Sequence, residues 1–414
     1  MPKAILVVCD GMADLPNPEF GGKTALQAAK KPNFDRLAKE GICGLMHSVG
    51  GNRVPGSDTS HLAMFGYSPD RYYTGRGPFE AIGAGLRLEH GDVAFRCNFA
   101  TVEKKGEKLV VRDRRAGRVE DKDAAALARL LDGMEIDGVK VILKHTVEHR
   151  AALILRGPGL SWKVSDTDPH DAAGVPILES RALDGSGQAK RTAEILNKLT
   201  QRAFMILSSH PINKERAKRK LPQANIILSR GPGIFEKVPT LGEKFGITAA
   251  CVAGGALYKG VAAYVGMNVL PVKGATGKAD TDVMAKGKAA LDALKRYDFV
   301  FLHVKGADNC GHDGKFKEKV RMIEKIDGMI GLLMKGVGKD AYIAVTADHT
   351  TSCVKMRHSH EPTPFALWGP FVRNDGTRSY DELECAKGGL GHFKGLDTMP
   401  MLVDLMGKAH IYGA

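Results

Sequence analysis

Three apolar runs in this chain each lead to an aspartate, and this pattern constrains the possible folds more than any other feature. The runs are Ala4–Cys9, Phe299–Val304 and Tyr342–Thr346. Because they are short, rich in Val and Ile and without alternation, they are typical of strands buried on both faces of a parallel sheet. The polar residues that follow them are Asp10, then Asp308 with His312, then Asp348 with His349. The pattern predicts a parallel sheet with carboxylates and imidazoles at one edge.

This expected edge has the ligands of a divalent metal site. In open α/β sheets, ligands bind outside the carboxyl ends of the strands. Carboxylates gathered there would repel one another unless a cation lay among them, and His358 offers a further imidazole on a segment stiffened by Pro362 and Pro364. No cysteine belongs to the set, which favours Mn²⁺, Zn²⁺ or Mg²⁺ over softer metals. We therefore predict a site for two divalent cations and no organic cofactor.

Length and composition limit the class of protein. At 414 residues the chain is too long for one ordinary hydrophobic core, so two domains are expected. Seven cysteines, an odd number with no C-x-x-C pair, argue against a disulfide framework and for a reducing compartment. The first apolar run is too short for a signal peptide, and no run is long enough to cross a membrane. We expect a soluble, cytoplasmic protein with no membrane partner.

The net charge of +13 fits either nucleic-acid binding or the attraction of small anionic substrates. The densest basic run, Lys214–Lys220, includes a glutamate and has no interleaved aromatic residue that could stack on a base. Such a composition is typical of the polar face of a helix. We therefore expect a small-molecule substrate and no nucleic acid as partner.

The order of the predicted elements indicates an α/β fold. Strands are expected at Ile247–Ala253 and Val269–Val272, and helices within Lys31–Gly41, Val283–Arg296 and Lys315–Met334. This alternation demands a mainly parallel central sheet flanked by helices, with right-handed crossovers. Residues 87–240 have more scattered charge and shorter apolar runs, which predicts a smaller inserted α/β domain that binds the substrate. The catalytic, metal-binding domain then comprises residues 1–86 and 241–414.

A nucleophile is expected in the loop rich in Gly and Pro that precedes residue 61. Ser57 follows Pro55 and Gly56 on a turn that should expose its hydroxyl at the start of a helix. A serine hydroxyl bound to a metal ion loses its proton more readily than a free one, so Ser57 is a candidate phosphoryl acceptor. Thr59 and Ser60 are rivals on spacing alone, and a helix-capping role for Ser57 is the structural alternative.

A short motif recurs three times along the chain. Arg76, Arg156 and Arg230 are each followed by Gly-Pro. The repeat has two interpretations: it marks the turn next to a strand, or it holds arginines on tight turns where they bind phosphate or carboxylate.

Several segments resemble the alkaline phosphatase superfamily, namely ILVVCDGMAD, KPNFDRLAKEG, GADNCGH, TADHTT and HSHEPTP. Within that superfamily, PGSDTSHLAMFGYSPDRYYTGRGPFEA, RCNFATV and VSDTDPH are similar to the archaeal-type cofactor-independent phosphoglycerate mutase family. The resemblance extends from Met1 to about Gly407, in the family's motif order. It implies interconversion of 3-phosphoglycerate and 2-phosphoglycerate through a phosphoserine, in glycolysis and gluconeogenesis and without 2,3-bisphosphoglycerate.

The resemblance also implies roles for particular residues. Ser57 would accept the phosphoryl group, Lys259 would lie near that group, and Asp168 or His170 would act as general base. The implied metal ligands are Asp308, His312 and His358 for one ion, and Asp10, Ser57, Asp348 and His349 for the other. The implied substrate-binding residues are Arg76, Arg150, Asp166 and Arg230. Manganese is the expected ion, with zinc and magnesium as alternatives.

Two points depart from or compete with this interpretation. His360 stands where the family more often has a small residue, and in an extended segment it would share a face with His358 and compete for an ion. A metal-dependent phosphomonoesterase or another phosphomutase of the superfamily is the alternative function, and a basic nucleic-acid-binding or scaffold protein is the distant one. The proposed mutase is compatible with a homo-oligomer.

Overall fold

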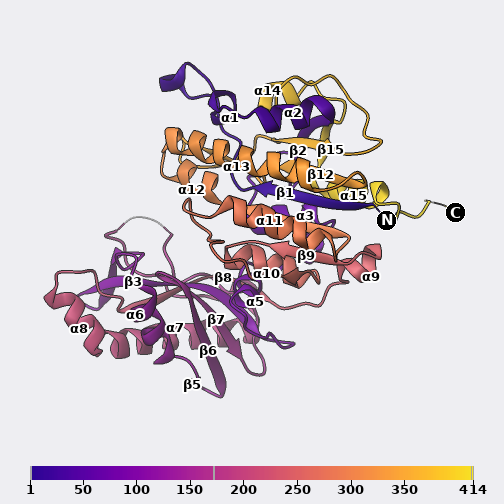
Figure 1. Ribbon diagram of the computed structural model, residues 1–414. Helices are drawn as coiled ribbons and strands as arrows, with labels where there is room; N and C mark the ends of the chain where they lie inside the picture. The colour runs from indigo at the N-terminus through magenta and orange to yellow at the C-terminus, as the bar shows by residue number, and fades with distance from the viewer. Residues whose placement is uncertain (1, 171–172, 412, 414) are drawn as a thin grey trace. The chain divides into compact units, whose positions relative to one another are not determined.

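In the computed structural model, which describes residues 2–170, 173–411 and 413, the chain forms two compact units (Figure 1). The first comprises Met1–Tyr73 and Val238–Ala414, and the second comprises Thr74–Lys237. The sequence-based boundary at residue 86 lies later than the structural one. Helix α5 (Gly77–Gly83) packs on strands β3 (Val93–Lys105) and β8 (Ile226–Ile234), so it belongs to the inserted unit.

The first unit is built on an eight-stranded sheet in the order β10-β9-β11-β1-β12-β15-β2-β16. In that order the strands are Asn268–Val269, Ala249–Val252, Phe299–Val304, Lys3–Cys9, Ala341–Thr346, Thr363–Trp368, Ile42–His47 and Gly391–Lys394. The predicted mainly parallel sheet is confirmed, since β1 pairs in parallel with β11 and β12. Strand β15 alone runs antiparallel to both of its neighbours, β12 and β2.

Helices cover both faces of this sheet. They are α1 (Ala25–Ala28), α2 (Pro32–Glu40), α3 (Ser57–Met64), α4 (Pro69–Tyr72), α9 (Leu241–Phe245), α10 (Ala256–Tyr264), α11 (Val283–Leu294), α12 (Gly306–His312), α13 (Phe316–Gly336), α14 (Glu382–Cys385) and α15 (Thr398–Leu405), with 3₁₀ turns at Pro18–Phe20 and Gly395–Asp397. A short hairpin joins β13 (Thr350–Ser352) to β14 (Arg357–Ser359). The predicted helices correspond to α2, α11 and α13.

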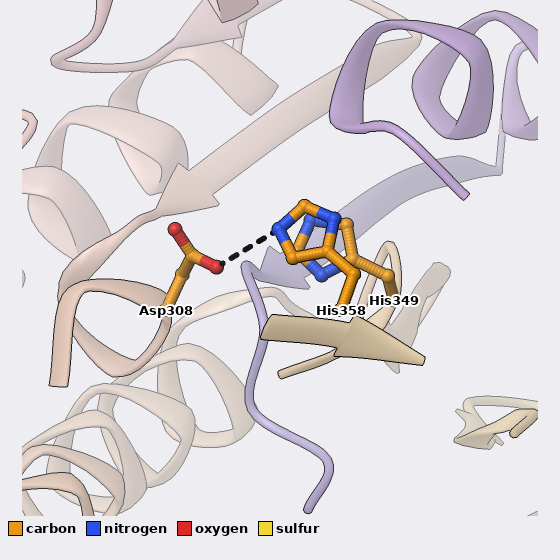
Figure 2. Close-up of side chains that lie close together, drawn as sticks. All are labelled: Asp308, His349 and His358. Atoms are coloured by element: carbon orange, nitrogen blue, oxygen red, sulfur yellow. Dashed lines mark ion pairs between the residues drawn. The ribbon is translucent and has the colours of Figure 1, made fainter. Parts of the chain in front are cut away.

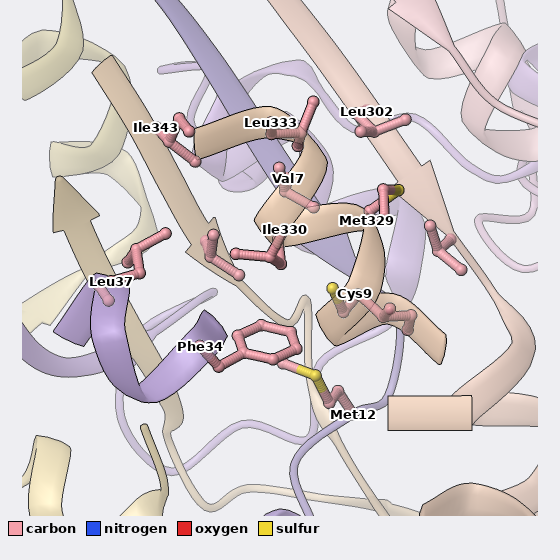
Figure 3. Close-up of a cluster of buried hydrophobic side chains, with 14 of the residues drawn as sticks. Val7, Cys9, Met12, Phe34, Leu37, Leu302, Met329, Ile330, Leu333 and Ile343 are labelled. Atoms are coloured by element: carbon pink, nitrogen blue, oxygen red, sulfur yellow. The ribbon is translucent and has the colours of Figure 1, made fainter. Parts of the chain in front are cut away.

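One face of the sheet packs against α2, α11 and α13. Val7, Leu302 and Ile343 project from neighbouring strands into this core (Figure 3). Phe34 and Leu37 of α2 meet them together with residues of α13, including Met329, Ile330 and Leu333. The other face contacts α3 and α10, where the Phe65 and Phe301 rings lie 4.9 Å apart. Burial on both faces explains why the strands show no alternation.

The second unit contains an antiparallel sheet in the order β4-β3-β7-β6-β5, with β8 paired to β3. Besides α5, β3 and β8, its elements are β4 (Lys108–Asp113), β5 (Glu135–Ile136), β6 (Val139–Val147), β7 (Arg150–Arg156), α6 (Asp121–Arg129), α7 (Gly187–Ser209) and α8 (Pro211–Lys218). Leu196 and Leu199 of α7 pack with strand residues such as Phe95 and Leu153. Within the described residues of both units, no helix is long and apolar enough to span a bilayer.

Candidate active site

The three aspartates predicted from the apolar runs lie at the carboxyl ends of their strands. Asp10 directly follows β1, and Asp348 lies two residues beyond the end of β12. Asp308 is in the first turn of α12, which follows β11. Ser57 is the first residue of α3, and its side chain makes no capping hydrogen bond there. Ser57 therefore does not have the helix-capping role that was the structural alternative in the sequence.

These side chains converge on His349. Its Nε2 lies 3.2 Å from Asp348 Oδ2, 3.6 Å from Asp10 Oδ1 and 3.1 Å from Ser57 Oγ. Two ligand groups have all their donor atoms within 4.8 Å of one another: Asp10 with Asp348 and His349, and Asp308 with His349 and His358. Figure 2 shows the second group, in which His358 Nε2 lies 3.5 Å from Asp308 Oδ1.

His312 extends the second group. Its Nε2 lies 3.3 Å from Asp308 Oδ1 and 3.1 Å from His358 Nε2. The structure thus brings all seven predicted metal ligands together. The predicted division assigned His349 to one ion only, whereas in the structure His349 belongs to both ligand groups.

The donor set fits cations. Asp10 and Asp348 are fully buried, and within the described chain neither Asp10 Oδ1 nor Asp348 Oδ2 has a hydrogen-bond partner. Buried carboxylate oxygens without donors are costly unless a positive charge compensates them. Burial disfavours the charged imidazole of His349, but Asp348 and then Asp10 outweigh burial and raise its pKa to about 9. The site therefore attracts positive charge.

A threonine that the sequence did not single out orients two of these ligands. Thr351 Oγ1 donates to Asp308 Oδ1 at 2.8 Å and lies 3.0 Å from His349 Nδ1. Because its single hydroxyl proton goes to Asp308, Thr351 accepts from Nδ1–H of His349. When a cation takes the place of the second ring proton, this arrangement directs the Nε2 lone pair of His349 at the site, as metal-binding histidines require. Gly11 leaves room for this hydroxyl, since a Cβ at residue 11 would collide with it.

Two further residues around Asp10 were missed from the sequence. Lys305 Nζ lies 2.6 Å from Asp308 Oδ2 and 3.2 Å from Asp10 Oδ2, so it bridges the two ligand groups. His303 Nε2 also lies 3.2 Å from Asp10 Oδ2, and its ring stacks on Tyr258 at 3.5 Å. Burial is the main reason that the pKa of His303 falls to about 4. The sequence offered one signal for Lys305, namely its position between the end of β11 and Asp308.

The second unit contains a cluster of arginines around the buried Glu80. Glu80 Oε1 lies 3.1 Å from Arg76 Nε and 3.7 Å from Arg96 Nη1. Burial, followed by the charge of Arg76, lowers the pKa of Arg96. Burial and Arg76 likewise lower the pKa of Arg230, to about 10, and Arg150 adds to the positive potential at Glu80 and Arg96. Such a surplus of guanidinium groups suits an anionic ligand.

The Arg-Gly-Pro repeat divides between the two interpretations. Arg76 and Arg230 belong to the arginine cluster. Arg156 instead forms ion pairs with Asp92 at 2.7 Å and Glu89 at 2.8 Å, and it donates to the carbonyl of Arg87. This third copy therefore serves the fold of the second unit rather than an anion site.

The predicted general-base candidates lie beside the arginines. His170 Nε2 is 2.6 Å from Asp166 Oδ2, and its Nδ1 is 3.4 Å from Arg230 Nη1. Asp168 is fully buried and paired with Arg114 at 2.8 Å. Burial raises the pKa of Asp168, but the hydrogen bond and charge of Arg114 outweigh it and lower the pKa. Arg114 and Arg96 are further residues that the sequence did not single out.

Lys259 and His360 complete the predicted residues. Lys259 is half-buried in α10, next to the Tyr258 that stacks on His303. His360 belongs to neither metal-ligand group. It lines a separate cavity with His47, because β14 ends at Ser359 and the strand alternation that would align residues 358 and 360 stops there.

Comparisons with known proteins relate the chain to one family along its whole length. A family model for 2,3-bisphosphoglycerate-independent phosphoglycerate mutase matches residues 38–213. The chain is 49% identical over 413 residues to such a mutase from Methanocaldococcus jannaschii, covering 100% of this chain and 99% of the relative. It is 45% identical to one from Methanothermobacter thermautotrophicus, with 100% of both chains covered.

Two solved structures have the same architecture. A cofactor-independent phosphoglycerate mutase from Thermoplasma acidophilum is 37% identical, with a TM-score of 0.69 over 98% of this chain and 100% of the other. A protein from Pyrococcus horikoshii, also 37% identical, aligns with a TM-score of 0.86 over 100% of this chain and 99% of the other.

Proposed function

The chain belongs to the 2,3-bisphosphoglycerate-independent phosphoglycerate mutase family, and from this premise we propose that it interconverts 3-phosphoglycerate and 2-phosphoglycerate through a phosphoserine at Ser57. One observation carries the assignment of the nucleophile. The Ser57 hydroxyl lies 3.1 Å from His349 Nε2, beside buried carboxylate oxygens that have no donor within the described chain. We extend the proposal to a role in glycolysis and gluconeogenesis with a small anionic substrate, which the family membership supports.

Two divalent cations, Mn²⁺ by our proposal, would be held by the two ligand groups. Asp10, Asp348 and His349 would hold one next to Ser57, and Asp308, His312 and His358 the other. When bound, such ions favour the ionised serine hydroxyl and neutralise phosphoryl oxygens. Lys305, between Asp10 and Asp308, places a fixed positive charge beside both groups. His303 orients Asp10 through its Nε2.

The chemical steps balance within one substrate molecule. Ser57 Oγ forms a bond to the phosphorus of 3-phosphoglycerate as the bond to the C3 oxygen breaks, and the C3 oxygen takes up a proton. The retained glycerate turns, its C2 hydroxyl loses a proton and attacks the phosphoserine, and Ser57 is released. Positioning and charge neutralisation supply most of the catalysis in such transfers.

The second unit supplies the groups that bind glycerate and move its protons in this proposal. Arg76, Arg150 and Arg230 neutralise the carboxylate and phosphate, and buried Arg96 reinforces them. Of the two candidate bases we prefer His170, because Asp166 orients its ring whereas Asp168 is paired with Arg114. One imidazole suffices, because it gives a proton to the C3 oxygen in the first half-reaction and takes one from the C2 hydroxyl in the second.

The function is tested by an assay coupled to enolase. With 3-phosphoglycerate as substrate, we expect 2-phosphoglycerate to form, the activity to disappear on chelation with EDTA, and Mn²⁺ to restore it. Free glycerate is measured in parallel. Release of glycerate and phosphate in place of 2-phosphoglycerate would identify a phosphatase instead, and activity that survives complete removal of metal would contradict the two-cation site.

A substitution of Thr351 tests the orientation of the metal ligands. Thr351→Val keeps the shape of the side chain but removes the hydroxyl that contacts both Asp308 and His349. We expect the affinity for Mn²⁺ to fall by about 10- to 100-fold, as for other residues that orient metal ligands. Calorimetric titration measures the affinity. Thr350→Val is the matched control, because Thr350 is equally buried but its hydroxyl donates to the carbonyl of Glu361. Equal affinities for Mn²⁺ in the two variants would show that Thr351 does not orient the metal ligands.

A further inference from the structure

A fully buried lysine joins three segments of the first unit close to the metal ligands. Lys319 is the fourth residue of α13 and has no exposed surface. Its ammonium donates to the carbonyl of Ala13, in the loop after β1, at 2.9 Å and to that of Thr351, in β13, at 2.7 Å. The nitrogen also lies 3.1 Å from Oδ2 of Asp14, whose side chain is equally buried. Among the hydrogen bonds and ion pairs of the described residues, none joins Lys319 to a predicted metal ligand.

The stability of α13 does not explain this lysine. A positive charge near the N-terminus of a helix is opposed by the helix dipole. Burial of an ammonium is costly as well, and a buried ion pair often stabilises a fold no more than apolar residues of similar volume. The same helix places Phe316, Met322 and Ile323 in the core, where an apolar residue is the usual choice. A residue that breaks such local rules points to a functional constraint.

The contacts of Lys319 hold the backbone of Thr351 on two sides. The Thr351 carbonyl accepts from Lys319, and the Thr351 N–H donates to the Ala13 carbonyl at 3.1 Å. That carbonyl of Ala13 accepts from Lys319 as well. Asp14 completes the junction, because its Oδ1 accepts from the N–H of Cys353, two residues beyond Thr351, at 3.0 Å. Strand β13 is therefore attached to the loop after β1 at Thr351 and again just past its end.

The place of β13 determines the geometry of the second ligand group, which is Asp308 with His349 and His358. The Thr351 hydroxyl contacts both Asp308 and His349. Thr351 is also opposite His358 in the antiparallel pair of β13 and β14. One residue thus links all three members of the group. A shift of the Thr351 backbone would move its hydroxyl and the strand that carries His358.

We propose that Lys319, with Asp14 as its counter-ion, is a positioning residue for the ion of the second ligand group. The inference rests on the two-cation site of the proposed function. Lys319 acts through the backbone of Thr351, which it holds where the hydroxyl meets Asp308. Asp14 compensates the positive charge that this junction buries. Without the ammonium, the Thr351 carbonyl loses this donor and β13 is held less firmly.

Lys319→Met tests this role, because methionine has a similar shape but donates no hydrogen bond. We expect the affinity for Mn²⁺, measured by calorimetric titration at a temperature where the variants are folded, to fall by about 10- to 100-fold. The Tm should fall too, since Asp14 is left as an unpaired buried charge. Lys31→Met is the matched control and should keep the wild-type affinity. Lys31 is also buried, but it pairs with Asp35 and donates to Ser379, outside the junction.

A double variant separates positioning from stability. Asp14→Asn combined with Lys319→Met leaves neither charge of the pair behind, and the asparagine oxygen can still accept from the N–H of Cys353. We expect this protein to regain most of the lost Tm but to keep the low affinity for Mn²⁺, because the donor to Thr351 is still missing. Should Lys319→Met fail to fold, the double variant is compared with the wild type by the same criterion.

Three results would overturn the proposal. They are an unchanged affinity for Mn²⁺ in Lys319→Met, recovery of the affinity together with the Tm in the double variant, and a fall of the same size in Lys31→Met. Calorimetry detects bound ions without turnover. A failure of this inference is therefore distinguishable from a failure of the proposed mutase function, which the assay coupled to enolase decides.

Discussion

The Ser57→Ala protein is expected to lose mutase turnover by at least about 10⁴-fold, as other enzymes do when their nucleophile is removed. The substitution deletes the only atom of the loop that lies at hydrogen-bond distance from His349 Nε2 among the contacts of the described residues. It should leave the fold unchanged, because Ser57 does not cap α3. The coupled assay with enolase measures the loss, with thermal unfolding as the check on the fold.

The same loop offers two matched controls. Thr59 and Ser60 were rivals for Ser57 on spacing, but Thr59 Oγ1 donates to the Gly56 carbonyl and Ser60 Oγ donates to Ser48. Both hydroxyls are thus directed away from the metal ligands. Thr59→Ala and Ser60→Ala should cost about 1 kcal/mol of stability through a lost hydrogen bond and keep most of the activity. Substantial activity in Ser57→Ala, or its loss in a control alone, would contradict the assignment.

The Asp348→Asn protein is expected to bind no more than one Mn²⁺ per chain and to lose activity by at least about 10³-fold, because a neutral amide replaces a charged ligand. Asp348 Oδ1 accepts from the backbone N–H groups of Gly11 and His349, and the asparagine oxygen can keep both bonds. Its amide nitrogen would stand where the unpartnered Oδ2 faces His349. Metal analysis after dialysis against Mn²⁺ measures the change.

Asp327 provides the control for Asp348. Its buried carboxylate accepts from the backbone N–H groups of Asn33 and Phe34 and lies outside both ligand groups. Asp327→Asn should lower the stability without altering the metal content. An Asp348→Asn protein that binds two Mn²⁺ would show that this carboxylate is not a ligand.

The central strands could be predicted because burial on both faces leaves a run of apolar residues with a polar residue at its end. The prediction for β11 coincides with the observed bounds, and α2 begins at Pro32 and ends before Gly41, as its capping signals indicate. Strands β2, β15 and β16 were not predicted. They form the outer part of the sheet, where β15 directly follows Pro362 and contains Pro364, and β16 has only four residues of mixed polarity.

The part of the active site that could be predicted consists of residues that follow the ends of strands. Convergence of Asp10 with Asp308 and Asp348 follows from parallel pairing, which needs no knowledge of loops. Thr351 and Arg96 could not be found in this way, since a buried threonine or arginine in a strand has no distinctive spacing. Their roles depend on contacts between segments far apart in the chain, such as Thr351 with Asp308. The contact between His47 Nε2 and His392 Nδ1, 2.9 Å apart, was missed for the same reason.

The central claim is that Ser57 carries the phosphoryl group between two hydroxyls of one glycerate. It is tested most directly by mixing the Mn²⁺-loaded protein with 3-phosphoglycerate, quenching in acid within the first turnovers and locating the phosphate by peptide mass spectrometry. We predict a phosphoserine at Ser57 that forms and decays at rates compatible with turnover. Phosphate on another residue, or 2-phosphoglycerate formed without any phosphorylated protein, would contradict the account.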